Sequence, residues 1–277
     1  MNSIAASAAE SASDNALDNA PDNKADKASA DSINVLSGAD SVEQDRRAAF
    51  MQQFADSPLP DTEQLQNLGL YINRPALSRL LFMHELYQKI INVHGVIMEF
   101  GVRWGQNMAL FSNFRGIYEP YNYNRSIIGF DTFSGFPQVD EKDGTMVAVG
   151  DYGVTGHYDD YLAALLDYHE SESPISHKKK YQLIKGDATS SFAQYLTEHP
   201  ETIVAFAYFD FDIYLPTRHC LELLLPRLTK GSVLAFDELN CPQFPGETIA
   251  LLEVIGLSTY AIKRSPLNPL ISYIIVD

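Results

Sequence analysis

Acidic residues end two apolar segments in the C-terminal half of the chain. The segment FDFDIYLP holds Asp210 and Asp212, and the segment AFDELN holds Asp237 and Glu238. Neighbouring parallel strands lie about 5 Å apart and end at the same edge of a sheet, so these carboxylates are expected to converge there. Converging carboxylates repel one another and lose hydration unless a cation compensates them. We therefore favour a divalent cation with oxygen ligands at this point, the alternative being helix caps and solvated loop acids.

A further acidic residue, Glu99, lies in the segment EFGVRWGQN, where a strand is expected to pass through a glycine turn into a helix. Gly101 and Gly105 would let the backbone approach a ligand closely, and the start of the helix offers free N–H groups. A carboxylate beside this turn favours a cationic or amino-bearing ligand and repels a pyrophosphate. Glycine turns of this kind also serve packing alone, so ligand binding and packing both remain open for the turn itself.

Two more acids end predicted strands farther along the chain. Asp131, in GFDTFSGFP, is placed to accept hydrogen bonds from ribose hydroxyls, and Asp187, in KGDATSSF, from an adenine amino group. The alternatives are a turn cap at Asp131 and a helix N-cap at Asp187. Thr132 and Ala188, which follow them directly, belong to the same predicted cofactor site.

The segments that end in these acids alternate with segments of helical periodicity. Continuous apolar runs are typical of strands buried on both faces of a parallel sheet. Two final strands are joined by SPLNP, which is too short for a crossover helix, so they are expected to pair antiparallel. The predicted strands are 96–101, 126–131, 181–187, 203–211, 231–238, 257–264 and 271–277, and the predicted helices are 75–93, 105–113, 161–169, 188–196, 217–225 and 246–255.

This order of elements predicts the fold class. Five parallel strands and a C-terminal antiparallel hairpin, with helices on both faces, outline the seven-stranded class I methyltransferase fold, a Rossmann-like α/β fold. The Rossmann fold of oxidoreductases lacks the hairpin, which separates the two classes.

Residues 138–180 interrupt the alternation of strands and helices. An insertion of this length in a compact domain is typically a lid or a binding loop. Although it falls between the second and third strands, it can reach the carboxyl edge of the sheet, where ligands bind in open α/β folds. Tyr152, His157 and Tyr158 are its candidate substrate contacts, while a lone histidine such as His157 is more often structural or exposed.

The composition divides the chain into two parts. Residues 1–57 are built largely from Ala, Ser, Asp and Asn and are expected to form a disordered acidic tail, since they can bury little apolar surface. Residues 58–277 suit one α/β domain. No basic segment followed by an apolar one marks a secretory signal at the start.

Charge and cysteine content restrict the partners and the compartment. The net charge of −16 argues against nucleic acid as a partner, and no apolar run approaches the ~20 residues that span a bilayer. Cys220 and Cys241 lack metal-site spacing and predict free thiols in a reducing, cytoplasmic compartment. We expect a small-molecule substrate, and a homo-oligomer is compatible with the sequence.

Taken together and in this order, several motifs resemble the macrocin O-methyltransferase family, whose members methylate sugar hydroxyls with S-adenosylmethionine. The resemblance covers most of residues 75–277. It is based on EFGVRWG, GFDTFSGFP, GDYGVTGHYDDYL, IKGDA, FDFDIYLPT, FDELN and FPGE.

The resemblance implies specific residue roles. A magnesium or manganese ion would be held by Asp210, Asp237 and Glu238, and the cofactor would contact the residues Glu99, Gly101, Asp131 and Asp187. Two departures from the family pattern bear on metal and substrate: the strand-five acid pair is Asp237-Glu238 where Asp-Asp is usual, and the first loop reads Arg103-Trp104 where the order is usually reversed.

The resulting hypothesis is a metal-assisted O-methyltransferase that acts on a sugar or a glycosylated small molecule. Asp210 or Asp212 would accept the proton of the attacking hydroxyl, with Asp210 also a metal ligand. Two alternatives remain: another metal-assisted reaction on the same fold, such as hydroxylation, and a non-catalytic binding protein that keeps the fold.

Overall fold

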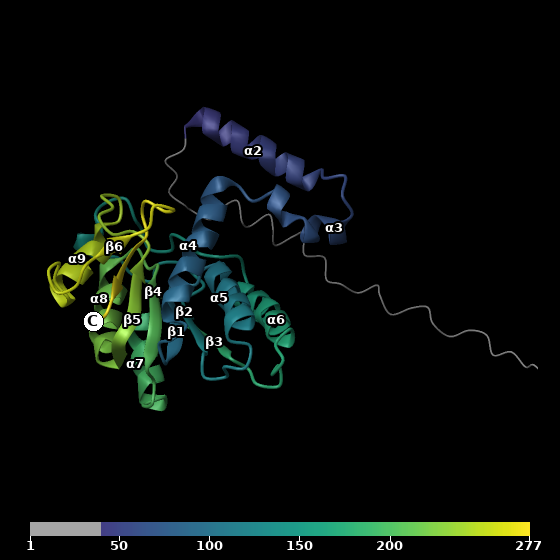
Figure 1. Ribbon diagram of the computed structural model, residues 1–277. Coiled ribbons are helices and arrows are strands. Elements are labelled where there is room, and N and C mark those ends of the chain that lie inside the picture. The colour runs from purple at the N-terminus through teal and green to yellow at the C-terminus, as the bar shows by residue number, and fades with distance from the viewer. Residues whose placement is uncertain (1–39) are drawn as a thin grey trace, which may run out of the picture.

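A single seven-stranded sheet organises the protein. The computed structural model describes residues 40–277 (Figure 1). The strand order is β3-β2-β1-β4-β5-β7-β6; the first five strands in the sequence are parallel, and β7 is antiparallel to both of its neighbours. The predicted fold class is confirmed. The strands are β1 (Val96–Phe100), β2 (Ile127–Asp131), β3 (Tyr181–Lys185), β4 (Val204–Phe209), β5 (Leu228–Phe236), β6 (Lys263–Arg264) and β7 (Ser272–Ile275).

Helices cover both faces of this sheet (Figure 1). One apolar core joins the sheet to α4 (Arg74–Ile90), α5 (Gln106–Tyr118) and α6 (Tyr158–Ser171). The other joins it to α7 (Ala188–Glu198), α8 (Tyr214–Leu224) and α9 (Pro245–Val254). Because both faces are covered, every residue of β4 is buried, which explains its uninterrupted apolar sequence.

A row of phenylalanines crosses the sheet directly beneath its carboxyl edge. Phe100 of β1 stacks on Phe130 of β2 and on Phe209 of β4, with ring centroids 5.2 and 4.8 Å apart, and Phe209 stacks on Phe236 of β5 at 5.2 Å. All four rings are fully buried. Aromatic stacking in a dry core fixes the four strand ends relative to one another, so the residues that follow them are held in register.

Several predicted boundaries differ from the structure by a few residues, and the differences at α8 and β6 have a clear physical reason. Helix α8 begins at Tyr214, three residues before the predicted start, because Pro216 lies in the first turn, where its missing N–H is not needed. The Tyr214 N–H is instead bonded to the Asp143 carboxylate at 2.6 Å. The predicted strand 257–264 is reduced to Lys263–Arg264, since only its last two residues pair with β7.

The insertion is only partly a loop. Its helix α6 contributes the buried Leu162 and Leu166 to the core beside α5, so this part of the predicted lid is a structural layer. The preceding residues 132–157, with the short 3-10 helix η3 (Glu141–Asp143), lie beside the carboxyl ends of the strands. They are held by backbone hydrogen bonds between Phe136 and both Gly150 and Asp151.

A buried ion cluster ties α6 to the sheet. Arg115 of α5 and Lys180, just before β3, both pair with Glu170 of α6, and the three side chains are at most 6% exposed. Removing the carboxylate would leave two buried cations without a counter-charge, bonded to backbone carbonyl groups only.

We therefore expect Glu170→Ala to lower the free energy of unfolding by about 3 kcal/mol, because breaking a buried ion pair costs far more than losing an exposed one. Urea unfolding of the variant measures this, with the exposed Glu172→Ala as the matched control. A loss no greater than that of the control would contradict a structural role for the cluster.

The N-terminal part of the described chain is helical rather than disordered. Helix α2 (Ser41–Ala55) begins at Asp40, whose side chain accepts from the Glu43 N–H, and α3 (Asp61–Gln66) and the 3-10 helix η2 (Leu68–Leu70) follow. The prediction of disorder is thus wrong for residues 41–55. An N-cap and residues of high helix propensity stabilise a helix there although the segment buries little apolar surface. Residues 1–39 lie outside the described residues.

Two smaller expectations concern the cysteines and membrane helices. Cys220 and Cys241 are both free, as predicted. Between residues 40 and 277, no helix is long and apolar enough to cross a membrane.

Candidate active site

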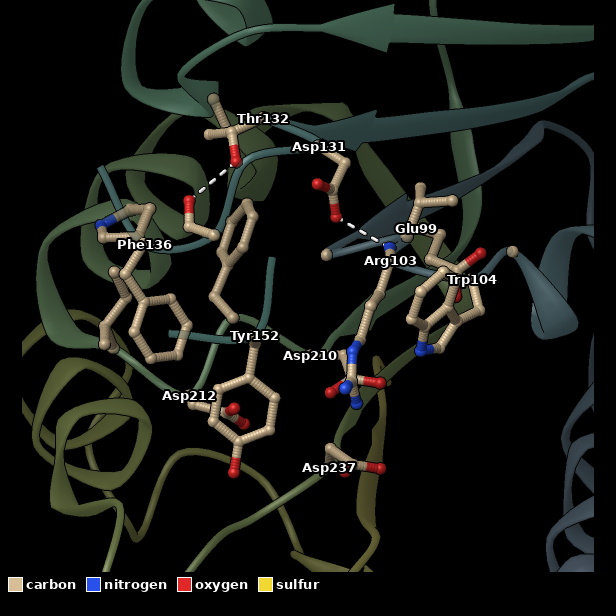
Figure 2. Close-up of a pocket in the computed structure, with 18 of the residues that line it drawn as sticks. Glu99, Arg103, Trp104, Asp131, Thr132, Phe136, Tyr152, Asp210, Asp212 and Asp237 are labelled. Atoms are coloured by element: carbon tan, nitrogen blue, oxygen red, sulfur yellow. Dashed lines mark hydrogen bonds between the residues drawn. The ribbon is translucent and has the colours of Figure 1, made fainter. Parts of the chain in front are cut away.

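One cavity of about 360 Å³ lies at the carboxyl edge of the sheet (Figure 2). Every residue predicted to bind cofactor or metal, or to act as a base, lines it. These residues are Glu99, Gly101, Gly105, Asp131, Thr132, Asp187, Ala188, Asp210, Asp212, Asp237 and Glu238. Of the candidate contacts in the insertion, Tyr152 lines the cavity. His157 is 91% exposed at its side chain, and the Tyr158 hydroxyl donates to the Trp104 carbonyl.

The turn after β1 needs both of its glycines. Gly101 has φ +94°, and a Cβ there would overlap the backbone carbonyl of Asp210 on the neighbouring strand. Gly105 has φ +72° at the N-cap of α5, where a Cβ would overlap the side chain of Leu162. Close approach of two backbones therefore accounts for Gly101, and a positive φ beside the Leu162 side chain accounts for Gly105.

Glu99 is buried at the base of this turn. One carboxylate oxygen accepts from Asn107 at 2.8 Å, while the other, Oε2, is buried without a hydrogen-bond partner. Burial raises the pKa of Glu99 well above its ordinary value. An unsatisfied buried oxygen on a cavity wall is suited to a ligand that donates a hydrogen bond or carries positive charge.

Asp131 fixes the turn after β1 from the end of β2. Its two oxygens accept from the backbone N–H groups of Arg103 at 2.7 Å and Phe133 at 2.6 Å. The turn cap, the alternative reading of Asp131, is thus present, and each oxygen retains a lone pair for a ligand. Thr132 extends the same turn by donating to the Gly135 carbonyl at 2.7 Å (Figure 2).

Asp187 is the N-cap of helix α7. It accepts from the Thr189 N–H at 2.9 Å and from the Thr189 hydroxyl at 2.7 Å, through the same oxygen. The helix-cap reading is therefore present here too. The other oxygen is not engaged by Thr189, so capping leaves room for a hydrogen bond into the cavity.

The acids after β4 and β5 do converge, but a guanidinium group lies between two of them. Arg79 of α4 bonds Asp210 at 2.9 Å and Asp237 at 3.1 Å. The buried Tyr208 hydroxyl donates to the same Asp237 oxygen and accepts from Arg79 at 3.1 Å. Sequence reasoning missed Arg79 and Tyr208, because one looks like an ordinary polar position on an amphipathic helix and the other like a core aromatic.

A single guanidinium does not compensate the whole acid cluster. Asp212, 8% exposed, lies near the cluster with a left-handed backbone (φ +61°). Glu247 of α9, also missed, is fully buried; one oxygen accepts from the Glu238 N–H at 3.3 Å, and the other has no partner. Its only signal in the sequence was the motif FPGE.

The protonation of these acids reflects the crowding. Burial raises the pKa of Asp210 to about 7, with Asp237 adding to the effect. Burial and neighbouring carboxylates likewise raise the pKa values of Asp212, Glu238 and Glu247. These carboxyl groups take up protons in the folded protein at pH values where unfolded ones, at about 4, are ionised.

The raised pKa values of these acids make the stability of the metal-free protein depend on pH. Between pH 4 and the raised pKa values the folded state binds more protons than the unfolded state, so stability falls as pH rises through this range. In chelator, we expect the melting temperature to be lower at pH 8 than at pH 6. Asp210→Asn should make this dependence shallower, and a melting temperature that rises with pH would contradict the reading.

Arg103 brings a second positive charge into the cavity. Its guanidinium lies 5.0 Å from the Tyr152 ring centroid and 5.7 Å from that of Trp104, and its Nε is buried without a partner. Figure 2 shows this side chain running from the side of Asp131 toward Asp210 and Asp237. Tyr152 belongs to the insertion, so the insertion helps to set the position of the charge.

The carboxylate oxygens of the acid cluster are ligands of the kind that divalent cations such as Mg²⁺ prefer. Glu238 Oε2 and Glu247 Oε1 are buried oxygens without partners, and the hydrogen bonds to Arg79 use one oxygen each of Asp210 and Asp237. Within residues 40–277, however, no group of three His, Cys, Asp or Glu side chains is arranged to hold a metal as the side chains stand.

The fold and the site together define a class I methyltransferase. The strand order, the glycine turn after β1 and the acids at the ends of β1, β2 and β3 meet at the edge where this class binds its ligands.

Comparison with known structures narrows the class to a family. The calicheamicin methyltransferase CalS11 is 40% identical, with a TM-score of 0.82 over 87% of this chain and 98% of that one. An apo structure of CalS11, described as a TDP-rhamnose 3'-O-methyltransferase, gives 38% identity and a TM-score of 0.77 over 87% and 96%. The chain therefore belongs to the family of sugar O-methyltransferases that includes CalS11.

More distant comparisons add less. The O-methyltransferase NovP, at 17% identity and a TM-score of 0.51 over 72% of this chain and 79% of its own, shares the fold. No protein-family model and no curated protein matches the chain. The narrower resemblance to macrocin O-methyltransferases stays a prediction.

Proposed function

We propose that this protein transfers the methyl group of S-adenosylmethionine to a hydroxyl group of a sugar, with the help of a divalent cation. The observation that carries the proposal is the single cavity lined by all of the predicted cofactor, metal and base residues, in a chain that belongs to the CalS11 family. S-adenosylmethionine supplies an already activated methyl group, so the protein has to position the acceptor and increase its nucleophilicity.

The cofactor is assigned to the side of the cavity formed by β1, β2 and β3. The unpartnered oxygen of Glu99 would receive the methionine amino group, and the turn at Gly101 and Gly105 would admit the methionine part closely. Asp131, with Thr132 beside it, would accept the ribose hydroxyls. Asp187 and Ala188, at the start of α7, would line the adenine.

This assignment predicts a loss of affinity in Asp131→Ala. The variant should bind S-adenosylhomocysteine at least about tenfold more weakly, ~1.4 kcal/mol, because it loses the ribose contact. It also loses the carboxylate that accepts from the Arg103 and Phe133 N–H groups and so holds the turn in place. Calorimetric titration measures this, and the matched control is Asp160→Asn at a side chain that is 84% exposed. Equal affinity in wild type and variant would contradict the role of Asp131.

The cation is assigned to Asp210, Asp237 and Glu238, with Mg²⁺ or Mn²⁺ suited to an all-oxygen donor set. Bound there, it would supply positive charge that lowers the pKa of a sugar hydroxyl. Glu247 would hold the Glu238 backbone in place from behind.

Asp212 is the better candidate for the general base. It borders the acid cluster, and no hydrogen bond joins its carboxylate to another described residue, whereas Asp210 is engaged by Arg79. A raised pKa makes its carboxylate a stronger proton acceptor than an ordinary aspartate, once it is ionised. Residues 132–157, through Phe136 and Tyr152, would exclude water from the acceptor.

The acceptor that we propose is a nucleotide-linked deoxysugar, by analogy with the activity named for CalS11. Arg103, with a buried Nε that lacks a partner, supports an anionic group in the substrate. A nucleoside diphosphate would supply that charge, and a neutral glycoside would not.

Calorimetric titration of the wild-type protein with S-adenosylhomocysteine tests the cofactor part of the proposal. We expect saturable binding with a micromolar Kd, about −8 kcal/mol. Intact folding without any binding would contradict the proposal and favour a non-catalytic protein of the same fold.

A further inference from the structure

The guanidinium group of Arg79 bridges Asp210 and Asp237, two of the proposed metal ligands. Its Nη2 donates to Asp210 Oδ2 at 2.9 Å and its Nη1 to Asp237 Oδ1 at 3.1 Å. Within the described residues, these two aspartates form ion pairs with Arg79 alone. The positive charge that the converging acids require is thus already present in the chain, supplied by helix α4.

We propose that Arg79 is the resident counter-cation of Asp210 and Asp237, and that a divalent cation binds these aspartates by displacing its guanidinium group. This inference deepens the proposed function, on which it rests for the identity of the ligands. Arg79 is then a positioning residue that holds Asp210 and Asp237 together in the metal-free protein and lowers the affinity of these aspartates for metal.

Electrostatics favours displacement over joint occupancy. A guanidinium and a divalent cation placed between the same two carboxylates would repel each other strongly in this partly buried region, where Arg79 and Asp210 are only about a quarter exposed. With Arg79 in place, no three acidic side chains among residues 40–277 are arranged around a common point as metal ligands. The arrangement seen here is therefore that of the arginine-bound state.

The side chain has room to move while its helix stays fixed. Helix α4 is anchored by Phe82, Met83 and Leu86, which are fully buried. Arg79 itself lines the cavity and is 27% exposed at its side chain, so rotation of its long stem carries the guanidinium into solvent within the cavity. Tyr208, which is bonded to Asp237, would keep that aspartate oriented during the exchange.

Manganese binding to Arg79→Gln tests this inference. Electron paramagnetic resonance of free Mn²⁺ gives the affinity, with Arg79→Lys as an intermediate variant and the exposed Arg74→Gln on the same helix as the control. We expect Arg79→Gln to bind Mn²⁺ at least about tenfold more tightly than wild type, because the metal no longer competes with a fixed positive charge. Arg79→Lys should fall between them, because one ammonium group cannot bridge both carboxylates.

Thermal stability provides a second readout. In chelator, Arg79→Gln should melt at a lower temperature than wild type, and saturating Mn²⁺ should raise its melting temperature more than that of wild type. If Arg79→Gln folds only with Mn²⁺ present, that result also supports the inference. The Mn²⁺ affinity is then compared between wild type and Arg79→Lys.

Unchanged or weaker Mn²⁺ binding in the Arg79 variants would overturn the inference and show that Arg79 orients the ligands. Absence of Mn²⁺ binding in every protein would overturn it together with the metal site. Titration with S-adenosylhomocysteine reports separately on the proposed function, since the cofactor is assigned to the other side of the cavity. Tighter Mn²⁺ binding without cofactor binding would leave the inference standing and contradict the methyltransferase.

Discussion

Asp212→Asn is expected to lower kcat for methyl transfer by about 10²–10⁴-fold, the contribution typical of a positioned general base. The amide cannot accept the proton of the attacking hydroxyl. Asparagine tolerates the left-handed backbone of this position (φ +61°), so the substitution introduces little strain. Affinity for S-adenosylhomocysteine should stay within about threefold of wild type, because Asp212 lies on the acceptor side of the cavity.

Steady-state kinetics and calorimetry on the same protein preparation check both parts of this prediction. The control is Asp160→Asn, an exposed aspartate on α6 that should leave both quantities unchanged. A kcat for Asp212→Asn within about tenfold of wild type would assign the proton transfer elsewhere, first of all to Asp210.

The second large effect concerns the metal. Chelation followed by dialysis should abolish methyl transfer and leave binding of S-adenosylhomocysteine largely intact, and Mg²⁺ or Mn²⁺ should restore the activity. Asp237→Asn should lower kcat by at least about 100-fold with far less change in cofactor affinity, since it removes an interaction that stabilises the developing charge on the oxygen.

Asp160→Asn is the matched control for Asp237→Asn, because it also removes one carboxylate charge, at a side chain that is 84% exposed. Full activity in excess chelator would contradict the metal site. The acids would then be compensated by Arg79 alone, with Asp212 acting on a metal-free acceptor.

Much of the fold follows from local sequence, because the signals lie in the segments themselves. The uninterrupted apolar run ending at Phe209 indicates a strand covered on both faces, and β4 is entirely buried. The acids directly after such runs had to emerge at one edge of a parallel sheet. Asp210 and Asp237 do so, one residue beyond the ends of β4 and β5.

What the sequence could not reveal depends on contacts between distant segments. Arg79 is 131 residues from Asp210, and nothing in helix α4 marks that position as facing the cavity. Glu247 reaches the acid cluster only because α9 packs its first turn there, and Asp143 reaches Tyr214 across 71 residues. Because such distant contacts are not visible in the sequence, the acids indicate a bound metal ion but do not indicate Arg79, the cation that pairs with Asp210 and Asp237.

The predicted disordered tail extends to residue 57, whereas the structure has a helix over Ser41–Ala55, and the reason for this difference is local. Low apolar content correctly indicates that a segment buries little surface, and no residue of α2 is buried. It does not exclude a helix that is begun by an N-cap at Asp40 and supported by the Glu43–Arg47 pair. Composition therefore predicted the exposure of this segment but not its secondary structure.

The most direct test of the proposed activity is the mass of a reacted sugar. The protein is incubated with S-adenosylmethionine, Mg²⁺ and TDP-rhamnose, and the products are analysed by mass spectrometry. Methyl transfer predicts that the sugar nucleotide gains one methylene unit and that S-adenosylhomocysteine forms in equal amount. A gain of one oxygen atom, or an unchanged sugar nucleotide without formation of S-adenosylhomocysteine, would contradict it.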